Sequence, residues 1–324
     1  MSTRRTRLVA LVAALPVALA GCASVAGVHD APSEVPDGPS ISQTAGAEVT
    51  QRVLSETAVA LDLTGKQADA SRKAVLTGPA LAAAEARERV RRGDDGPGSL
   101  APKAEARVLA VSRGTGWPRS ILATSRQGEE QLLHVLVAEG PTSPYRLFAT
   151  VPMAAGASIP AFADPQDGVA VKPPKAVTEK DLTVVQTWAQ AVAHPAPKKQ
   201  PGGIALDDTF SSALRDNAAA QQKSLGKLAT YKVAHAVGKD GIVFSLADGG
   251  TLTIAGLTRK DTVTATNRAK ELRMPSEIAK VLGKDKITEE LTVSHLETVA
   301  IVTPGDGKSS VVAASEQLAD AKGS

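Results

Sequence analysis

The chain has 324 residues, with 37 lysines and arginines against 34 aspartates and glutamates. Three of the arginines lie in residues 1–21, which contain no lysine or acidic residue, so residues 22–324 carry 34 charges of each sign. A net charge of zero excludes the basic footprint that nucleic-acid binding requires, so no nucleic acid is expected as a partner. The only aromatic residues are two tryptophans, two tyrosines and four phenylalanines, which disfavours sugar-stacking platforms and aromatic interface hot spots.

The first 22 residues have the layout of a bacterial export signal. A basic start precedes an apolar run over residues 8–20, which is shorter than the roughly 20 residues that a resident membrane helix needs. The tetrapeptide Leu19-Ala20-Gly21-Cys22 resembles the bacterial lipobox, and Cys22 is the only cysteine in the chain. The resemblance implies that Cys22 receives a diacylglyceryl group and becomes the first residue of the mature chain.

Through the acyl chains on Cys22, the mature chain is expected to bind membrane lipid, which is the first predicted partner. Two acyl chains hold a protein firmly to a membrane leaflet, whereas one chain holds it only marginally. The location predicted is therefore the extracytoplasmic face of the cell membrane. An ordinary signal peptide with a chance cysteine is the alternative. The export route stays open, because Arg4-Arg5 fits the twin-arginine route but Arg7 stands where an apolar residue is expected.

Residues 22–46 are rich in Ser, Pro, Gly and Asp and predict a flexible tether. A first domain is predicted over residues 47–165. Apolar spacing predicts a helix over residues 48–61 and a second helical stretch over residues 66–92, which Pro79 should break or bend. Strands follow, and the short turns between most of them favour an antiparallel meander. The expected strands are residues 107–113, 120–125, 131–139 and 145–153.

A Pro- and Gly-containing stretch predicts a linker over residues 166–178, and a second domain is predicted over residues 179–321. Its helices are expected over residues 179–194 and 209–228, the second capped by Asp207 or Asp208. Strands are expected over residues 230–237, 241–247, 251–257, 291–303 and 309–315. The turn Asp248-Gly249-Gly250 predicts a hairpin, and a polar insert over residues 259–286 holds a possible short helix at residues 277–282.

The fold class predicted is α+β, with two tandem domains that each pack N-terminal helices on a curved antiparallel β-sheet. The order of elements is similar to that of nuclear-transport-factor-2-like and cystatin-like folds. The chain as a whole resembles an uncharacterised family of actinobacterial lipoproteins. The stretches that carry this resemblance are residues 61–65 (LDLTG), 76–84 (LTGPALAAA) and 117–119 (WPR). It implies location and architecture, and it assigns no catalytic residue.

The sequence contains no complete catalytic or metal-binding motif. No pair among His29, His134, His194, His235 and His295 has the close spacing of a zinc motif. No Gly-x-Ser-x-Gly elbow or P-loop occurs. We therefore expect no catalytic residues, no metal and no cofactor. Two strand histidines that meet in the fold would alter this expectation.

Folds of this type often enclose a pocket between helix and sheet, and pockets are the usual place for ligands. The candidate lining residues are Trp188, Phe210, Tyr231 and Phe244, which could equally fill the core.

Three functions remain open. The first is a lipid-anchored, extracytoplasmic binding or interaction lipoprotein without catalytic activity, which contacts an envelope protein or another envelope component. The second is a carrier of a lipid or other apolar ligand. The third is a cell-envelope enzyme, which would need polar groups from distant positions, such as His134 or His295 with Glu297.

Overall fold

The computed structural model describes residues 38–90 and 105–324, which belong to one compact unit. Helix α1 (Gln43–Asp62) begins five residues before the predicted helix. The reason is a capping serine in the stretch predicted as tether, because the Ser42 hydroxyl accepts a hydrogen bond from the Ala45 amide at 3.1 Å. The signal residues 19–22 and His29 lie outside the described residues.

The second predicted helical stretch divides into α2 (Lys66–Val75) and α3 (Gly78–Val90). The break predicted at Pro79 is confirmed, since only Leu76 and Thr77 separate the two helices. Pro79 is the second residue of α3, where a missing amide hydrogen removes no helical hydrogen bond.

A four-stranded antiparallel sheet follows in the order β1-β2-β3-β4, which is the predicted meander. Its strands are β1 (Arg107–Val111), β2 (Arg119–Gln127), β3 (Glu130–Ala138) and β4 (Arg146–Pro152). One face of this sheet packs against the first helices through a buried cluster that includes Leu54, Leu76 and Leu136. Alternate residues of the same strands face the opposite way, as the two-residue period of a strand requires.

The predicted linker contains structure of its own. Strand β5 (Val171–Lys172) joins the second sheet by pairing Val171 with Phe244. The carbonyl of the nearby Val169 accepts a hydrogen bond from the Arg113 amide at 2.8 Å, which ties the same segment to the first half. A short 3-10 helix, η1 (Pro174–Ala176), ends the segment. The division of the chain at this point stays a prediction.

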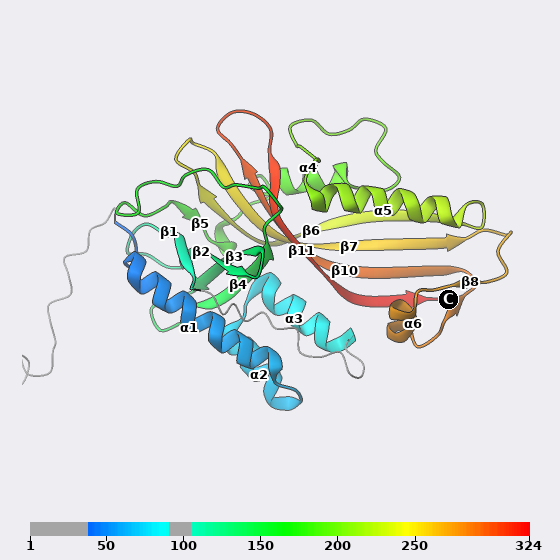
Figure 1. Ribbon diagram of the computed structural model, residues 1–324, viewed down its shortest axis with the longest axis horizontal. Helices are drawn as coiled ribbons and strands as arrows, with labels where there is room; N and C mark the ends of the chain where they lie inside the picture. Colours follow the sequence, from blue (N-terminus) through cyan, green and yellow to red (C-terminus); the bar gives the residue numbers. More distant parts are fainter. Residues whose placement is uncertain (1–37, 91–104) are drawn as a thin grey trace, which may run out of the picture. The chain divides into compact units, whose positions relative to one another are not determined.

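Two helices open the second half, α4 (Thr183–Ala191) and α5 (Thr209–Leu225). Of the two candidate caps, the structure selects Asp208, whose carboxylate accepts a hydrogen bond from the Ser211 amide at 2.8 Å. The indole nitrogen of Trp188 donates to the Ser211 hydroxyl at 2.8 Å and so ties α4 to α5. Figure 1 shows both helices along one side of the second sheet.

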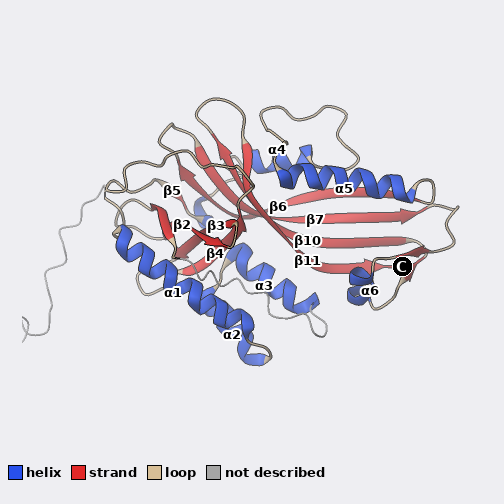
Figure 2. Cartoon of the chain, viewed as in Figure 1, coloured by secondary structure: helices blue, strands red, loops and turns tan. Residues whose placement is uncertain are grey.

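The second sheet has the order β11-β10-β7-β6-β5, and its long strands lie side by side (Figure 2). The strands are β6 (Ala229–Ser245), β7 (Thr251–Ala265), β10 (Glu290–Thr303) and β11 (Ser310–Gly323). The two strands predicted over residues 230–247 are one strand, β6, because a bulge between Val237 and Gly241 absorbs the extra residues without ending the ladder. The predicted hairpin at Asp248-Gly249-Gly250 is confirmed.

The predicted polar insert is partly strand, because β7 continues to Ala265. Its remaining part forms β8 (Leu272–Arg273), α6 (Ser276–Leu282) and β9 (Lys286–Ile287), and α6 agrees with the predicted short helix. A small apolar cluster that includes Leu272, Ile287 and Leu291 holds this subregion against the end of the sheet.

The two sheets share one hydrophobic core. Residues of the first sheet, such as Leu133 and Val151, pack in the same cluster as Ile242, Phe244 and Ile254 of the second. The opposite face of the second sheet carries a separate cluster under α4 and α5. The fold is thus α+β with antiparallel sheets, as predicted for the class. Among the described residues, no helix combines the length and apolar character needed to cross a membrane.

Candidate functional site

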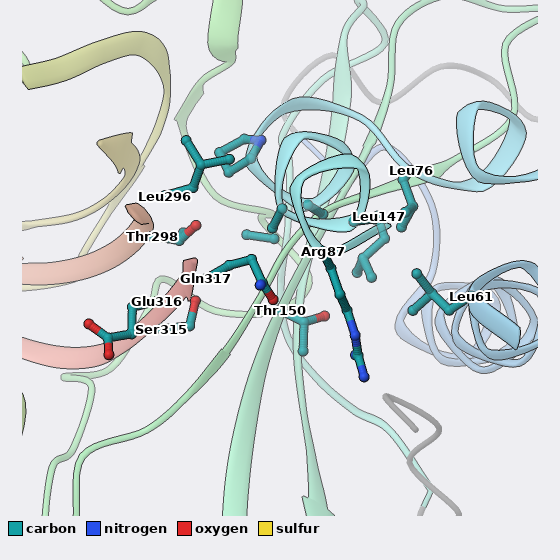
Figure 3. A pocket seen from close by; sticks show the side chains of 15 residues that line it. Leu61, Leu76, Arg87, Leu147, Thr150, Leu296, Thr298, Ser315, Glu316 and Gln317 are labelled. Atoms are coloured by element: carbon teal, nitrogen blue, oxygen red, sulfur yellow. The ribbon is translucent and has the colours of Figure 1, made fainter. Parts of the chain in front are cut away.

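A cavity of about 170 Å³ lies between α3 and strands of both sheets (Figure 3). Small and aliphatic side chains make up most of its wall. The polar lining residues are Arg87 on α3, Thr150 on β4, Thr298 on β10, and Ser315, Glu316 and Gln317 on β11. Figure 3 shows Glu316 and Leu61 on opposite sides of this α3 cavity. Its lining residues are Leu61, Leu76, Pro79, Ala80, Ala83, Ala84, Arg87, Leu147, Ala149, Thr150, Leu296, Thr298, Ser315, Glu316 and Gln317.

The sequence of α3 explains why space remains here. Alanines at positions 80, 83 and 84 leave room that larger side chains would occupy. The helix also begins very close to the first sheet, because a Cβ on Gly78 would lie 2.5 Å from the Phe148 ring. Gly78 has a φ of 52°, so glycine serves both the close approach and the left-handed backbone there. The helix is therefore held near the sheet while its small residues keep the cavity open.

A row of three polar side chains runs across the first sheet toward this cavity. The Ser125 hydroxyl lies 2.7 Å from Nε2 of His134, and the Thr150 hydroxyl lies 3.0 Å from Nδ1 of the same ring. Burial lowers the pKa of His134 to about 4, so the ring is neutral at physiological pH. A neutral imidazole donates from one nitrogen and accepts at the other, and the two hydroxyls satisfy both. Thr150 alone of the three lines the cavity.

A second polar group lies on the face of the second sheet that α5 covers. His235, Arg259 and His295 are direct cross-strand neighbours on β6, β7 and β10 and therefore share a face. Asp261 and Glu297 lie two residues further along their strands, which returns them to that same face. Together with Glu316 on β11, these side chains form what we call the Arg259 cluster.

Three carboxylates converge on the guanidinium of this cluster. Nη1 of Arg259 lies 2.7 Å from Glu297 and 2.6 Å from Glu316, and Nε lies 3.1 Å from Asp261. Burial alone would lower the pKa of Arg259, but the carboxylates, led by that of Glu297, raise it, so the guanidinium is permanently charged. Burial, aided by the positive charge of Arg259, lowers the pKa of the neighbouring His295.

Several atoms of the cluster are buried without a matching partner. The side chains of His235 and Glu297 are fully buried, and Nε2 of His235 lies 3.1 Å from Oε2 of Glu297. The pair is close enough for an ion pair, but it is not aligned as a hydrogen bond, so both atoms lack one within the described chain. Nδ1 of His235 is also unbonded among the described residues. A buried polar atom without a hydrogen bond lowers the stability of the folded state. The Arg259 cluster therefore contains polar atoms whose hydrogen bonds its own residues do not complete.

The four aromatic residues predicted to line a pocket separate into two pairs. Phe210 and Tyr231 line a pocket of about 130 Å³ under α5, together with Arg259, Asp261 and Glu316. Trp188 and Phe244 are fully buried in the two apolar clusters of the second sheet. The rings of Trp188 and His235 make a T-shaped contact, with centroids 5.4 Å apart, so Trp188 packs against one member of the Arg259 cluster.

The histidines proposed for an enzyme lie in different places. His295 and Glu297 belong to the Arg259 cluster, whereas His134 lies on the first sheet. His194 has its ring near Tyr231, with centroids 6.0 Å apart. Two strand histidines do share a face, His235 and His295, and both flank Arg259. Within the described ranges, no group of three or more His, Cys, Asp or Glu side chains is arranged to hold a metal ion.

Reasoning from the sequence missed Arg259 and Asp261 because residues 259–286 read as a polar insert. It missed Glu316 because the last strand was expected to end at residue 315, whereas β11 continues to Gly323. A signal was present in the two-residue spacing of Leu257, Arg259 and Asp261, which continues the strand that ends the predicted hairpin. Comparison of the chain with protein families, with curated proteins and with solved structures finds no match. The function must therefore be inferred from the chain's own residues.

Proposed function

We propose that this chain is a lipid-anchored binding protein of the bacterial cell envelope, on the extracytoplasmic face of the membrane, and that its α3 cavity receives an apolar group of a ligand or partner. The lipobox-like tetrapeptide ending at Cys22 supports the anchor. The observation that carries the binding function is the cavity itself, which is walled mostly by alanines and leucines and has polar residues from α3, β4, β10 and β11 among its lining.

The size of the cavity limits what it receives. A cavity of about 150 Å³ lined by aliphatic side chains binds benzene, whereas pockets for drug-sized ligands measure about 300–1,000 Å³. At about 170 Å³, the α3 cavity fits one ring or the end of one acyl chain. This volume favours recognition of an apolar group presented by a larger partner over carriage of a whole lipid, which is the alternative.

We also propose that the two halves are duplicated α+β domains with curved sheets. Each half places its helices before four antiparallel strands joined in chain order, β1-β2-β3-β4 and β6-β7-β10-β11. Bulges in both sheets, such as those at Val135/Leu136 and Ala300/Ile301, favour curvature. The common core supports a protein in which the halves act as one body, with the cavity formed by both.

The cavity is tested with benzene as the probe. Benzene should raise the thermal midpoint of the purified protein, and Ala83→Phe should abolish that rise because the added ring fills the cavity. Ala220→Phe, at an exposed position of α5 that does not line the cavity, is the matched control and should keep the response. Loss of the response in both variants, or in neither, would contradict binding at α3.

The anchor is tested separately by Cys22→Ser. This variant should lose incorporation of labelled palmitate and leave the membrane fraction, whereas Ser24→Ala should behave as the parent chain.

Native mass spectrometry of the parent protein then decides between the two ligand classes, an apolar group of a larger partner and a whole lipid. A stoichiometric copurifying lipid would favour the carrier alternative, and membrane retention of Cys22→Ser would refute the anchor.

A further inference from the structure

The pocket under α5 differs in chemistry from the α3 cavity, and Glu316 is the one lining residue that the two have in common. Its volume is about 130 Å³. One wall comes from α5 and contains no charged side chain, and the other comes from β6, β7 and β11. The lining residues are Phe210, Ala213, Leu214, Asn217, Ala218, Tyr231, Val233, Arg259, Asp261 and Glu316.

The charge around this pocket is not balanced by the residues that form it. Among the described residues of the Arg259 cluster, three carboxylates share one guanidinium. His295 adds no positive charge at neutral pH, since burial lowers its pKa. Even a protonated His235 would leave one negative charge in excess. Arg259 is already committed to all three carboxylates, so the pocket favours a cation and disfavours an anion.

The Arg259 cluster also contains buried atoms that lack an aligned hydrogen bond, on side chains that do not themselves line the pocket. The Glu297 side chain is fully buried behind Arg259, and its Oε2 has no aligned hydrogen bond within the described chain. The fully buried ring of His235 also has none there. A cation held by Asp261 and Glu316 would offset part of the negative charge that three carboxylates place around one guanidinium.

The lining residues and the volume of the pocket limit the chemistry and the size of that cation. Phe210 and Tyr231 place two aromatic rings in the lining of the pocket, and aromatic rings attract cations. The Tyr231 hydroxyl hydrogen bonds to Asp261, which orients that carboxylate, and burial together with Asp261 raises the pKa of Tyr231. The volume, near that of a benzene-sized cavity, admits a short unbranched group.

We propose that this pocket binds a primary ammonium group on a short alkyl stem, with the ammonium held by Asp261 and Glu316 and the stem against Phe210 and Tyr231. Free diamines and the ethanolamine headgroup of a lipid both present this chemistry. The shared feature is the ammonium, and the source is decided by experiment.

Isothermal titration calorimetry with n-butylammonium chloride tests the proposal, with n-butanol and butyrate as neutral and anionic probes of similar size. Only n-butylammonium should bind saturably, and added salt should weaken it because the attraction is electrostatic. Glu316→Gln should reduce its affinity about tenfold, as expected for loss of one charged hydrogen bond. Asp320→Asn is the matched control, because it lies on the same strand with a similarly exposed side chain, 48% against 46%, and does not line the pocket.

Ala213→Phe provides a second, steric variant at an exposed position of α5, where a large side chain should block the pocket without unfolding the helix. 1,4-Diaminobutane and phosphatidylethanolamine vesicles then separate the two sources, and vesicles of phosphatidylcholine serve as the control. Equal binding of n-butanol, equal weakening by Asp320→Asn and Glu316→Gln, or no saturable binding of any ammonium probe would overturn the proposal. Because Glu316 also lines the α3 cavity, Ala213→Phe separates the two sites, since Ala213 lines the α5 pocket and not the α3 cavity.

Discussion

His134 makes the stability of this protein depend on pH in a window set by one buried ring. The ring is fully buried between the hydroxyls of Ser125 and Thr150, and neither partner is a carboxylate that could stabilise a positive charge. Burial therefore lowers the pKa from 6.5 to about 4. Between these values the unfolded chain binds a proton at this residue and the folded chain does not, so stability falls as the pH falls.

The magnitude follows from the width of that window. One pKa unit corresponds to about 1.36 kcal/mol, so the shift of His134 predicts a loss of about 3 kcal/mol of unfolding free energy between pH 6.5 and pH 4. His134→Gln removes the titrating group while keeping a donor and an acceptor for the two hydroxyls. Between pH 6.5 and pH 4, the unfolding free energy of the variant should therefore fall by about 3 kcal/mol less than that of the parent chain.

Urea unfolding followed by circular dichroism at several pH values between 7 and 4 measures the effect. The comparison concerns the slope of stability against pH, because the substitution also changes packing and thus absolute stability. His194→Gln, at a partly exposed histidine, controls for the substitution itself. If the parent and His134→Gln lose stability equally between pH 6.5 and 4, the neutral buried ring inferred from the structure is wrong.

Three further perturbations address the packing and the charges. Arg259→Ala should lower the unfolding free energy by about 3–5 kcal/mol, because it leaves Glu297 buried without its countercharge. In the same urea assay, the double variant Arg259→Met, Glu297→Leu should regain most of the lost unfolding free energy, because it removes both charges. Phe244→Ala should cost about 3–5 kcal/mol and shift a single calorimetric transition, since both sheets share its core; two separate transitions would contradict a common unfolding unit. Asp208→Ala should cost about 1 kcal/mol through loss of the α5 cap, and an unchanged thermal midpoint would mean that the cap contributes nothing.

Much of the local structure followed from the sequence because it depends on short-range rules. The helices and strands of both halves were expected from apolar spacing, and Pro79, Asp208 and the turn at residues 248–250 marked breaks and caps by their own chemistry. The errors were also local in origin. A bulge near Gly241 joined two predicted strands, and charged residues at 259 and 261 were mistaken for loop because they lie on a covered face of β7.

The candidate sites could not be located in this way. Of the four predicted aromatic residues, Phe210 and Tyr231 line the pocket under α5, whereas Trp188 and Phe244 are fully buried. Nothing in their sequence context distinguishes the two pairs. The α3 cavity depends on how closely one helix approaches two sheets, which is set by contacts such as that between Gly78 and Phe148. These contacts join residues about 70 or more positions apart, beyond the reach of any periodic pattern.

The sequence by itself determined the α+β class, most element positions and the prediction of an acylated Cys22, because backbone propensity, side-chain period and signal motifs are read within a few residues. Only the tertiary structure decided that the sheets share one core, that three carboxylates meet at Arg259 and that two small pockets of opposite character exist. The reason is physical: strand pairing places residues far apart in the chain on one face, and burial then determines which charges remain uncompensated.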